Sequence, residues 1–109
     1  MNYVHGDLAK GRWNKFSLVE QMSNVGSEIF RTISWREKNK NNSEAAFFRA
    51  LELLIFTLQD PKNKGGVKEI ARVKEMLVDW YLGSRNYIST DEEWMKYFNQ
   101  FNIAARLSN

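Results

Sequence analysis

Apolar residues dominate one stretch of the chain, from Ala45 to Leu58, in which only Arg49, Glu52 and Thr57 are polar. A segment this apolar is expected to be buried on more than one side. On a helix, its central stripe consists of Phe47, Ala50, Leu51, Leu54 and Leu58. One shoulder of the stripe holds Phe48 and Ile55, and the other holds Ala46 and Leu53. We predict a helix over residues 42–60, around which the rest of the chain packs.

Helical periodicity recurs in three further segments of the chain, at residues 17–37, 67–83 and 90–107. The first begins with Ser17 and Glu20, which have the spacing of a capping box. The last begins in the same way, with Thr90 and Glu93. These reciprocal caps satisfy backbone N–H groups that a helix start leaves unpaired, so both segments are predicted to be helices.

Proline and glycine mark where the helices end. Asp60 precedes Pro61 and is therefore expected to leave the helical conformation, which ends the apolar helix there. Gly83 is placed to accept the left-handed conformation that follows many helices. Gly26 lies inside the first predicted helix, where it costs ~1 kcal/mol relative to alanine, so we expect a partner helix to approach it closely.

Four amphipathic helices joined by short connections, without strand-like alternation, predict an all-α fold, an antiparallel up-down four-helix bundle. We expect residues 16–109 to form this single domain. Residues 1–15 contain two glycines and no helical period, so we expect a flexible or extended arm. Trp13 and Phe16 are expected to anchor the end of the arm.

The composition is that of a folded domain. Of the 109 residues, 43% are hydrophobic, 14% aromatic and 27% charged, unlike the apolar-poor composition of disordered chains. There is no cysteine, which excludes disulfides and thiolate chemistry. No 18-residue uncharged stretch and no signal-peptide-like start occur. We therefore expect a cytoplasmic protein that does not associate with a membrane.

Candidate chemistry is sparse, because the only histidine is His5 in the predicted arm. A di-iron bundle needs several Glu-x-x-His ligands, and a Ser-His-Asp triad needs a suitably placed histidine. We therefore expect no metal, no cofactor and no enzymatic activity. Gly65 and Gly66 could bind an anion near a helix start, but such a pair is more often a turn.

Charged side chains on the predicted helices suggest two sites. One is a polar pocket between helices, for which the candidates are Glu28, Arg31, Arg49, Glu52 and Asp79. Ion pairs on the helix surfaces are the simpler interpretation of the same residues. The other is a basic end of the bundle that could hold nucleic acid, formed by Lys10, Arg12, Lys15, Lys62, Lys64, Lys68 and Arg106. The net charge of +3 is modest, and a solvated lysine-rich end is the simpler interpretation of these residues.

Several large apolar side chains are not needed by a four-helix core. They are the interface candidates Trp35, Phe48, Ile55 and Phe56. Phe56 is expected on the back of its helix, and Trp35 on the polar side of the first helix. An exposed aromatic patch that is complementary to itself favours a two-fold homodimer. The alternative is that tilted helices bury Phe56 and Trp35 within the monomer.

Two sequence motifs resemble a family. The segment Asn24-Val25-Gly26-Ser27-Glu28-Ile29 with Arg31, and the segment from Arg49 to Leu54 with Thr57, Leu58, Asp60 and Pro61, resemble a family of small uncharacterised prokaryotic helical proteins. That resemblance implies no activity.

The helical order is also similar, more distantly, to HEPN-type bundles, which include RNases and partners of nucleotidyltransferases. The RNase signature of that group places a histidine four to six residues after an arginine. Arg85 is followed by no histidine here, so the resemblance implies a bundle without RNase activity.

The sequence therefore predicts a non-enzymatic interaction protein, with self-association as its first expected role. A protein partner encoded by a neighbouring gene is also compatible with this interpretation. The alternative is a HEPN-like bundle that binds nucleic acid or a nucleotidyltransferase.

Overall fold

The computed structural model describes residues 11–83 and 89–108, and every regular element in these two ranges is a helix. The elements are α2 (Leu18–Trp35), α3 (Lys40–Gln59), the 3-10 helix η1 (Pro61–Gly66), α4 (Val67–Leu82) and α5 (Asp91–Leu107). The predicted all-α class is confirmed for this part of the chain. Among these helices, none combines the length and the apolar character needed to cross a membrane.

Both predicted capping boxes are present. At the start of α2, the Ser17 hydroxyl accepts a hydrogen bond from the Glu20 backbone N–H, and the Glu20 carboxylate accepts one from the Ser17 N–H. Thr90 and Glu93 make the same pair of bonds at the start of α5. Each box satisfies backbone donors that the first helical turn leaves free, which explains why the two helices begin where the sequence indicated.

The predicted helix ends are also confirmed. α3 stops before Asp60, whose extended backbone (φ −72°, ψ 117°) leads into Pro61. Gly83 follows α4 with φ 76°, the left-handed conformation that a residue without Cβ adopts at little cost.

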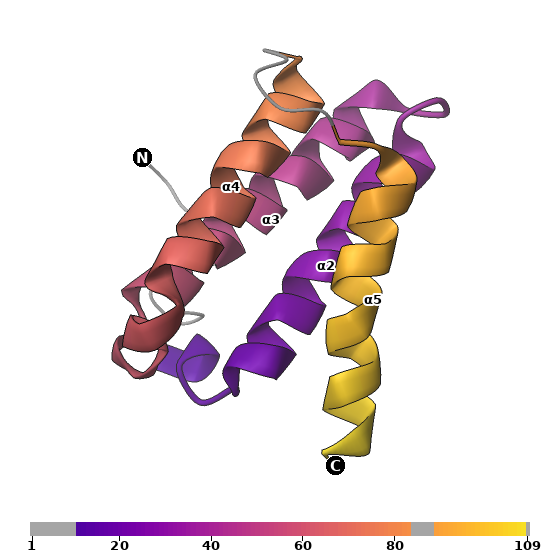
Figure 1. The fold of residues 1–109 in the computed structure, drawn as a ribbon. Coiled ribbons are helices and arrows are strands. Elements are labelled where there is room, and N and C mark those ends of the chain that lie inside the picture. The colour runs from indigo at the N-terminus through magenta and orange to yellow at the C-terminus, as the bar shows by residue number, and fades with distance from the viewer. Residues whose placement is uncertain (1–10, 84–88, 109) are drawn as a thin grey trace.

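α2 lies at the centre of the arrangement, with α3 on one side of it and α5 on the other (Figure 1). The closest backbone packing is that of α2 against α3 and of α2 against α5. α4 packs against α3 and η1. In the described chain, the backbones of α4 and α5 do not pack closely along their length.

The buried face of α3 is the predicted stripe shifted towards the shoulder that holds Ala46 and Leu53. The buried apolar side chains of α3 are Ala46, Phe47, Ala50, Leu53, Leu54 and Phe56. Leu51 and Leu58 are only partly buried, and Phe48 on the opposite shoulder is 54% exposed. The buried face is rotated because α3 packs against α2 as well as α4, which a single helical wheel does not reveal.

The predicted exposure of Phe56 is wrong, since its side chain is only 3% exposed and belongs to the main apolar cluster. The expected arm also needs correction near its end. Residues 11–13 are helical rather than extended, and Trp13 is buried in the same cluster. The anchoring role predicted for Trp13 is therefore confirmed, whereas Phe16 is 39% exposed and touches Trp13 edge-on. Residues 1–10 of the expected arm lie outside the described residues.

Gly26 is a point of close approach between α2 and α5. A Cβ atom placed on Gly26 would lie 2.7 Å from Cβ of Phe98, a distance that real Cβ contacts essentially never show. Phe98 is itself fully buried. The predicted approach of a partner helix to Gly26 is thus confirmed, and the partner is α5.

We expect Gly26→Ala to destabilise the fold although alanine favours helices. The gain in helix propensity is ~1 kcal/mol, whereas overpacking a well-packed core costs about 1–3 kcal/mol. A Cβ contact of 2.7 Å places the cost at the upper end of that range, so urea denaturation followed by circular dichroism should show a net loss of about 1–2 kcal/mol.

Gly65→Ala is the matched control for this variant, because nothing lies within 4 Å of the Cβ that it adds. It should leave stability nearly unchanged. A Gly26→Ala variant as stable as the parent protein would contradict the close packing of α2 on α5.

Candidate binding pocket between α4 and α5

A buried hydrogen-bond network joins the start of the described chain to α2 and to the end of α3. The Gln21 amide donates to the carbonyl of Trp13 (2.9 Å) and to Asp60 Oδ2 (2.8 Å). The Asn63 amide donates to Gln21 Oε1 (2.8 Å) and to the carbonyl of Thr57 (2.9 Å). Trp13 Nε1 donates to Thr57 Oγ1 (3.0 Å). Each buried polar side chain in this network has a partner, so its role is structural. We call the network of Trp13, Gln21, Thr57, Asp60 and Asn63 the clamp.

Asp60 carries the negative charge of this clamp and is only 4% exposed. Burial alone would raise the pKa of its carboxyl group. Hydrogen bonds from the Lys62 ammonium group and the Gln21 amide outweigh that effect and lower the Asp60 pKa below its ordinary value of 3.8. Lys62 also donates to the carbonyl of Asn14 (3.0 Å), which ties the charge pair to the segment before α2.

The predicted polar pocket is in part an ion cluster between α2 and α3. Glu28 is buried, and its two oxygens accept from Arg31 and Arg49, each at 2.9 Å. Glu52 is buried on α3 and Asp79 on α4, and both make interactions of their own. The simpler interpretation of the sequence, an ion pair on the helix surface, is contradicted for Asp79 by its burial. The structure thus joins Glu28, Arg31 and Arg49 as ion pairs.

A third polar cluster ties α4 to α5 at one end. Arg36 donates to both carboxylate oxygens of Asp91 (3.0 and 2.9 Å), and Trp80 Nε1 donates to Asp91 Oδ1 (3.0 Å). The Arg36 guanidinium lies over the Trp80 ring, 4.7 Å from its centroid. Trp80 also contacts Trp94 of α5, with ring centroids 6.4 Å apart. This end of the α4–α5 pair is therefore joined by side chains of α4, of α5 and of Arg36, the residue that follows α2.

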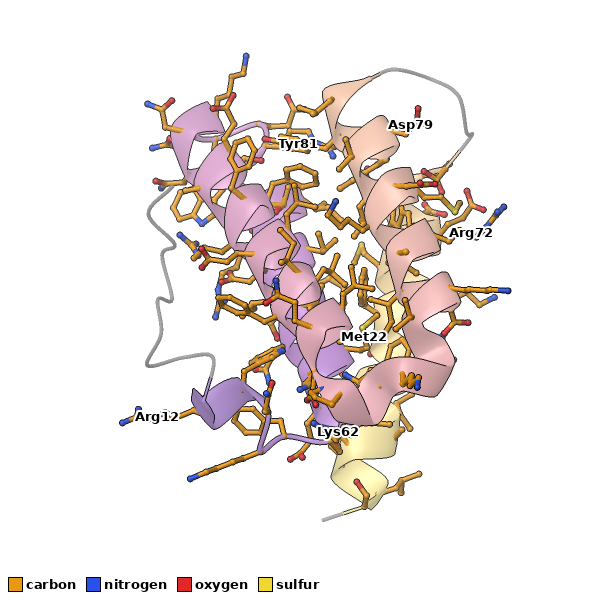
Figure 2. The ribbon with its side chains drawn as sticks, turned by 90° about the vertical axis from the view of Figure 1, so that its left-hand side faces the viewer. Arg12, Met22, Lys62, Arg72, Asp79 and Tyr81 are labelled. Carbon is orange, nitrogen blue, oxygen red and sulfur yellow. The ribbon has the colours of Figure 1, made fainter. Side chains whose placement is uncertain are left out.

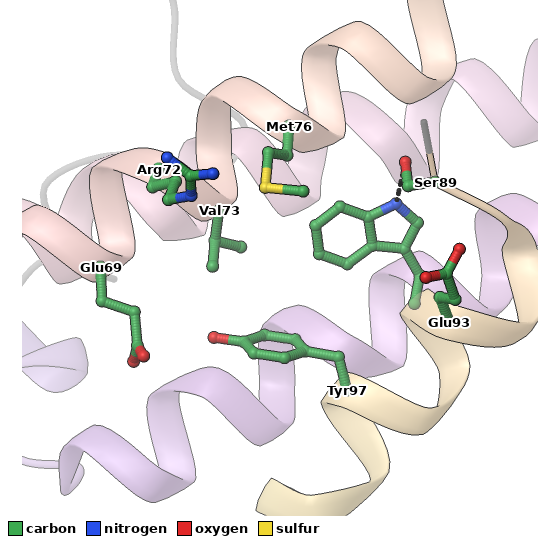
Figure 3. A pocket seen from close by; sticks show the side chains of 8 residues that line it. Glu69, Arg72, Val73, Met76, Ser89, Glu93 and Tyr97 are labelled. Atoms are coloured by element: carbon green, nitrogen blue, oxygen red, sulfur yellow. Dashed lines mark hydrogen bonds between the residues drawn. The ribbon is translucent and has the colours of Figure 1, made fainter. Parts of the chain in front are cut away.

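Beyond that end, residues of α4 and α5 line an open pocket of about 330 Å³ (Figure 3). Its lining residues are Glu69, Arg72, Val73, Met76, Ser89, Glu93, Trp94 and Tyr97. The indole N–H of Trp94 donates to Ser89 Oγ (3.1 Å), which fixes the ring at the edge of the pocket. The pocket thus has apolar and aromatic walls with charged side chains around them.

Tyr97 is the exceptional polar group of this pocket. Its hydroxyl oxygen is buried, and it has no hydrogen-bond partner in residues 11–83 and 89–108. Leaving a buried hydroxyl without a partner costs about 1–3 kcal/mol. Burial, with a smaller contribution from the nearby Glu69 carboxylate, raises the pKa of Tyr97 to about 12. The phenol therefore stays protonated at neutral pH and keeps a hydrogen to donate.

The predicted interface residues do not form one patch. Trp35 on α2 and Phe48 on α3 are 40% and 54% exposed, respectively. Ile55 is half-buried and Phe56 belongs to the core. Of the four candidates, Trp35 and Phe48 are therefore the ones with substantial exposed surface.

Most of the predicted basic residues are exposed. Arg12 and Lys62 lie toward the same end of the molecule, away from Asp79 and Tyr81 (Figure 2). The other exposed members of the set are Lys15, Lys64, Lys68 and Arg106. Lys62 is neutralised by Asp60, which reduces the positive charge available to a phosphate. Lys10 lies outside the described residues, as do His5 and Arg85.

Sequence reasoning missed the α4–α5 pocket and the Gln21 clamp. The burial of the Tyr97 hydroxyl without a partner in the described chain is a result of the three-dimensional packing. A polar residue on an apolar face, as Gln21 is on α2, was the available signal for the clamp. Within the described chain, no three histidine, cysteine, aspartate or glutamate side chains gather closely enough to hold a metal ion.

Comparison of the chain with protein-family models, with curated proteins and with solved structures found no match.

We expect Asp60→Asn to destabilise the protein by about 2–4 kcal/mol at pH 7, because the ammonium group of Lys62 and the Gln21 amide lose their charged acceptor. The lowered pKa of Asp60 adds stability that is complete above the ordinary pKa of 3.8 and is lost as pH falls through the folded-state pKa. Urea denaturation between pH 7 and pH 2 should therefore show a smaller acid-induced loss in Asp60→Asn than in the parent protein.

Glu75→Gln removes an exposed carboxylate of α4 and is the control for this comparison. Its stability and its acid response should stay close to those of the parent. An Asp60→Asn variant with an unchanged acid profile would show that Asp60 is not the titrating group of the clamp.

Proposed function

We propose that the protein is a non-enzymatic binding module and that the pocket between α4 and α5 is its ligand site. The observation that carries this proposal is the buried Tyr97 hydroxyl, which has no partner in the described chain although the other polar clusters near the core are paired. A bound molecule that pairs with this hydroxyl would offset the cost of burying it.

The size and lining of the pocket support this proposal. Ligand sites are typically concave spaces of roughly 300–1,000 Å³ with mostly apolar walls and a few placed polar groups. The pocket of about 330 Å³ is near the lower end of that range, which suits a small molecule. Val73, Met76 and Trp94 supply apolar contact surface, and Tyr97 supplies the polar group.

The scaffold that we propose for this site is an antiparallel up-down four-helix bundle that is open between α4 and α5. The packing of α2 against α3 and α5, and of α4 against α3, supports this arrangement. In such a bundle α4 and α5 form the remaining pair of neighbours. The pocket occupies the space where that pair would otherwise pack.

Met76→Trp tests the pocket, because the larger side chain should fill it. The neutral dye prodan, whose emission shifts to the blue in apolar surroundings, serves as the probe. We expect saturable binding to the parent protein and a dissociation constant raised roughly tenfold or more in Met76→Trp, which corresponds to at least ~1.4 kcal/mol. Fluorescence titration measures both constants.

Met95→Trp is the matched control, since Met95 lies on α5, is 43% exposed and does not line the pocket. It should bind prodan like the parent, and circular dichroism should show unchanged helix content in both variants. Prodan binding that both variants retain equally would place the dye elsewhere and contradict the proposed site.

Self-association is a second candidate function, favoured by the exposed rings of Trp35 and Phe48. Large exposed aromatic side chains are frequent anchors of protein interfaces. In a two-fold homodimer, both subunits would contribute the same rings to the interface.

Sedimentation equilibrium at micromolar concentrations tests the homodimer. We expect Trp35→Glu or Phe48→Glu to shift a dimer towards monomer while leaving helix content intact, because a buried carboxylate in the interface would be unpaired. Phe56→Glu is unsuitable for this purpose, since it would place a charge in the core. A parent protein that is monomeric at every concentration rules out the homodimer.

A further inference from the structure

We infer that the ligand of the α4–α5 pocket is a small, uncharged and largely apolar molecule with one hydrogen-bond acceptor, such as a carbonyl oxygen, that pairs with the Tyr97 hydroxyl. This inference rests on the proposed binding function and specifies the chemistry of the ligand.

The apolar part of the ligand follows from the walls of the pocket. Val73 and Met76 project from α4, and the ring of Tyr97 faces them from α5 (Figure 3). Trp94 of α5 lines the same pocket. Trp94 is held in place by its bond to Ser89 and by contact with Phe98, whose ring centroid is 6.0 Å away. A fixed aromatic wall opposite a flexible methionine favours flat apolar groups.

The acceptor follows from the protonation state of Tyr97. A tyrosine hydroxyl with its ordinary pKa of 10.0 already carries its hydrogen in the physiological pH range, and burial raises the pKa of Tyr97 further, to about 12. A neutral phenol is a hydrogen-bond donor as well as an acceptor, and its donor has no partner within the described residues. A ligand with an acceptor oxygen would satisfy it.

The hydroxyl lies at the edge of the pocket. Figure 3 shows the Tyr97 ring extending from α5 towards α4, with its oxygen directed to the side where Glu69 and Val73 lie. All three residues line the same pocket. Glu69 is exposed, so its long side chain is free to turn aside as an acceptor group approaches the phenol.

The absence of charge on the ligand follows from the side chains around the pocket. Glu69 and Glu93 contribute two negative charges to the lining and Arg72 contributes one positive charge. The lining therefore carries a net negative charge, which disfavours an anionic acceptor in the pocket. An ammonium group carries donors only and would leave the phenol hydrogen unpaired.

Three compounds of similar size separate these properties: acetophenone, with a neutral carbonyl; ethylbenzene, with no acceptor; and benzoate, with an anionic one. NMR titration, followed through the Met76 methyl signal, measures the affinity of the full chain for each. We expect acetophenone to bind roughly three- to tenfold more tightly than ethylbenzene, which is the usual range for one hydrogen bond, and benzoate to bind most weakly.

Tyr97→Phe removes the donor and retains the ring. It should remove the preference for acetophenone over ethylbenzene while leaving ethylbenzene binding unchanged, and its thermal stability should equal or exceed that of the parent. Tyr81→Phe is the matched control, because the Tyr81 hydroxyl lies 3.0 Å from Ser43 Oγ and does not line the pocket. It should lower thermal stability and keep the preference for acetophenone.

The outcomes distinguish this inference from the proposed function. If none of the three compounds shifts the Met76 signal, the binding function itself is wrong, and the inference fails with it. If ethylbenzene and acetophenone bind equally well, or if Tyr97→Phe keeps the preference, the pocket binds apolar molecules but Tyr97 does not select them. Tighter binding of benzoate than of acetophenone would overturn the assignment of an uncharged ligand.

Discussion

The contact between Gly26 and Phe98 determines how the other helices are placed. Because Gly26 has no side chain, Phe98 lies directly against α2, and α5 covers that flank of α2 closely. The other flank is taken by α3. α4 is left to pack on α3 through bulky rings, as the stacked pair of Phe47 and Tyr81 shows, with centroids 4.2 Å apart. α5 is held close to α2, whereas α4 is held on α3 by bulky rings. α4 and α5 therefore lie apart, and the pocket forms between them.

The pocket keeps its shape because one end of the α4–α5 pair is held. Asp91 at the start of α5 receives hydrogen bonds from Arg36, just after α2, and from Trp80 on α4. Both oxygens of this carboxylate accept from one nitrogen of the Arg36 guanidinium group, a charge-assisted contact that is stronger than a neutral hydrogen bond. It fixes the separation of the two helices at that end. The walls formed by Met76 and Trp94 lie close to this anchor, so the site is formed largely before any ligand binds.

Local signals in the sequence predicted the helices well, whereas the pocket depended on features that no local signal encodes. Ser17, Thr90 and Gly83 act within one turn of chain, so their caps could be predicted from spacing alone. The face of α3 that is buried depends on two neighbours, and for that reason Phe56 was expected to be exposed while it is in the core. Gly26 was informative because a glycine inside a helix is costly and requires a compensating contact. The Tyr97 hydroxyl lacks a partner in the described chain because α4 and α5 lie apart. The spacing of residues in the sequence does not predict the distance between two helices.

The buried polar groups at Asp60 and at Tyr97 differ in their hydrogen-bond partners, and this difference supports a structural role for Asp60 and the proposed binding role for Tyr97. Asp60 is buried with a charged partner and an amide donor, and Gln21 and Asn63 use their own amide groups in the same network. Such complete pairing stabilises one arrangement of the chain and leaves no group available for a ligand. Tyr97 has the opposite character, since phenylalanine would fill the same space without burying an unpaired oxygen. A hydroxyl that costs stability in the free protein, beside a pocket lined by Met76 and Trp94, is most simply explained by a contact made in the bound state.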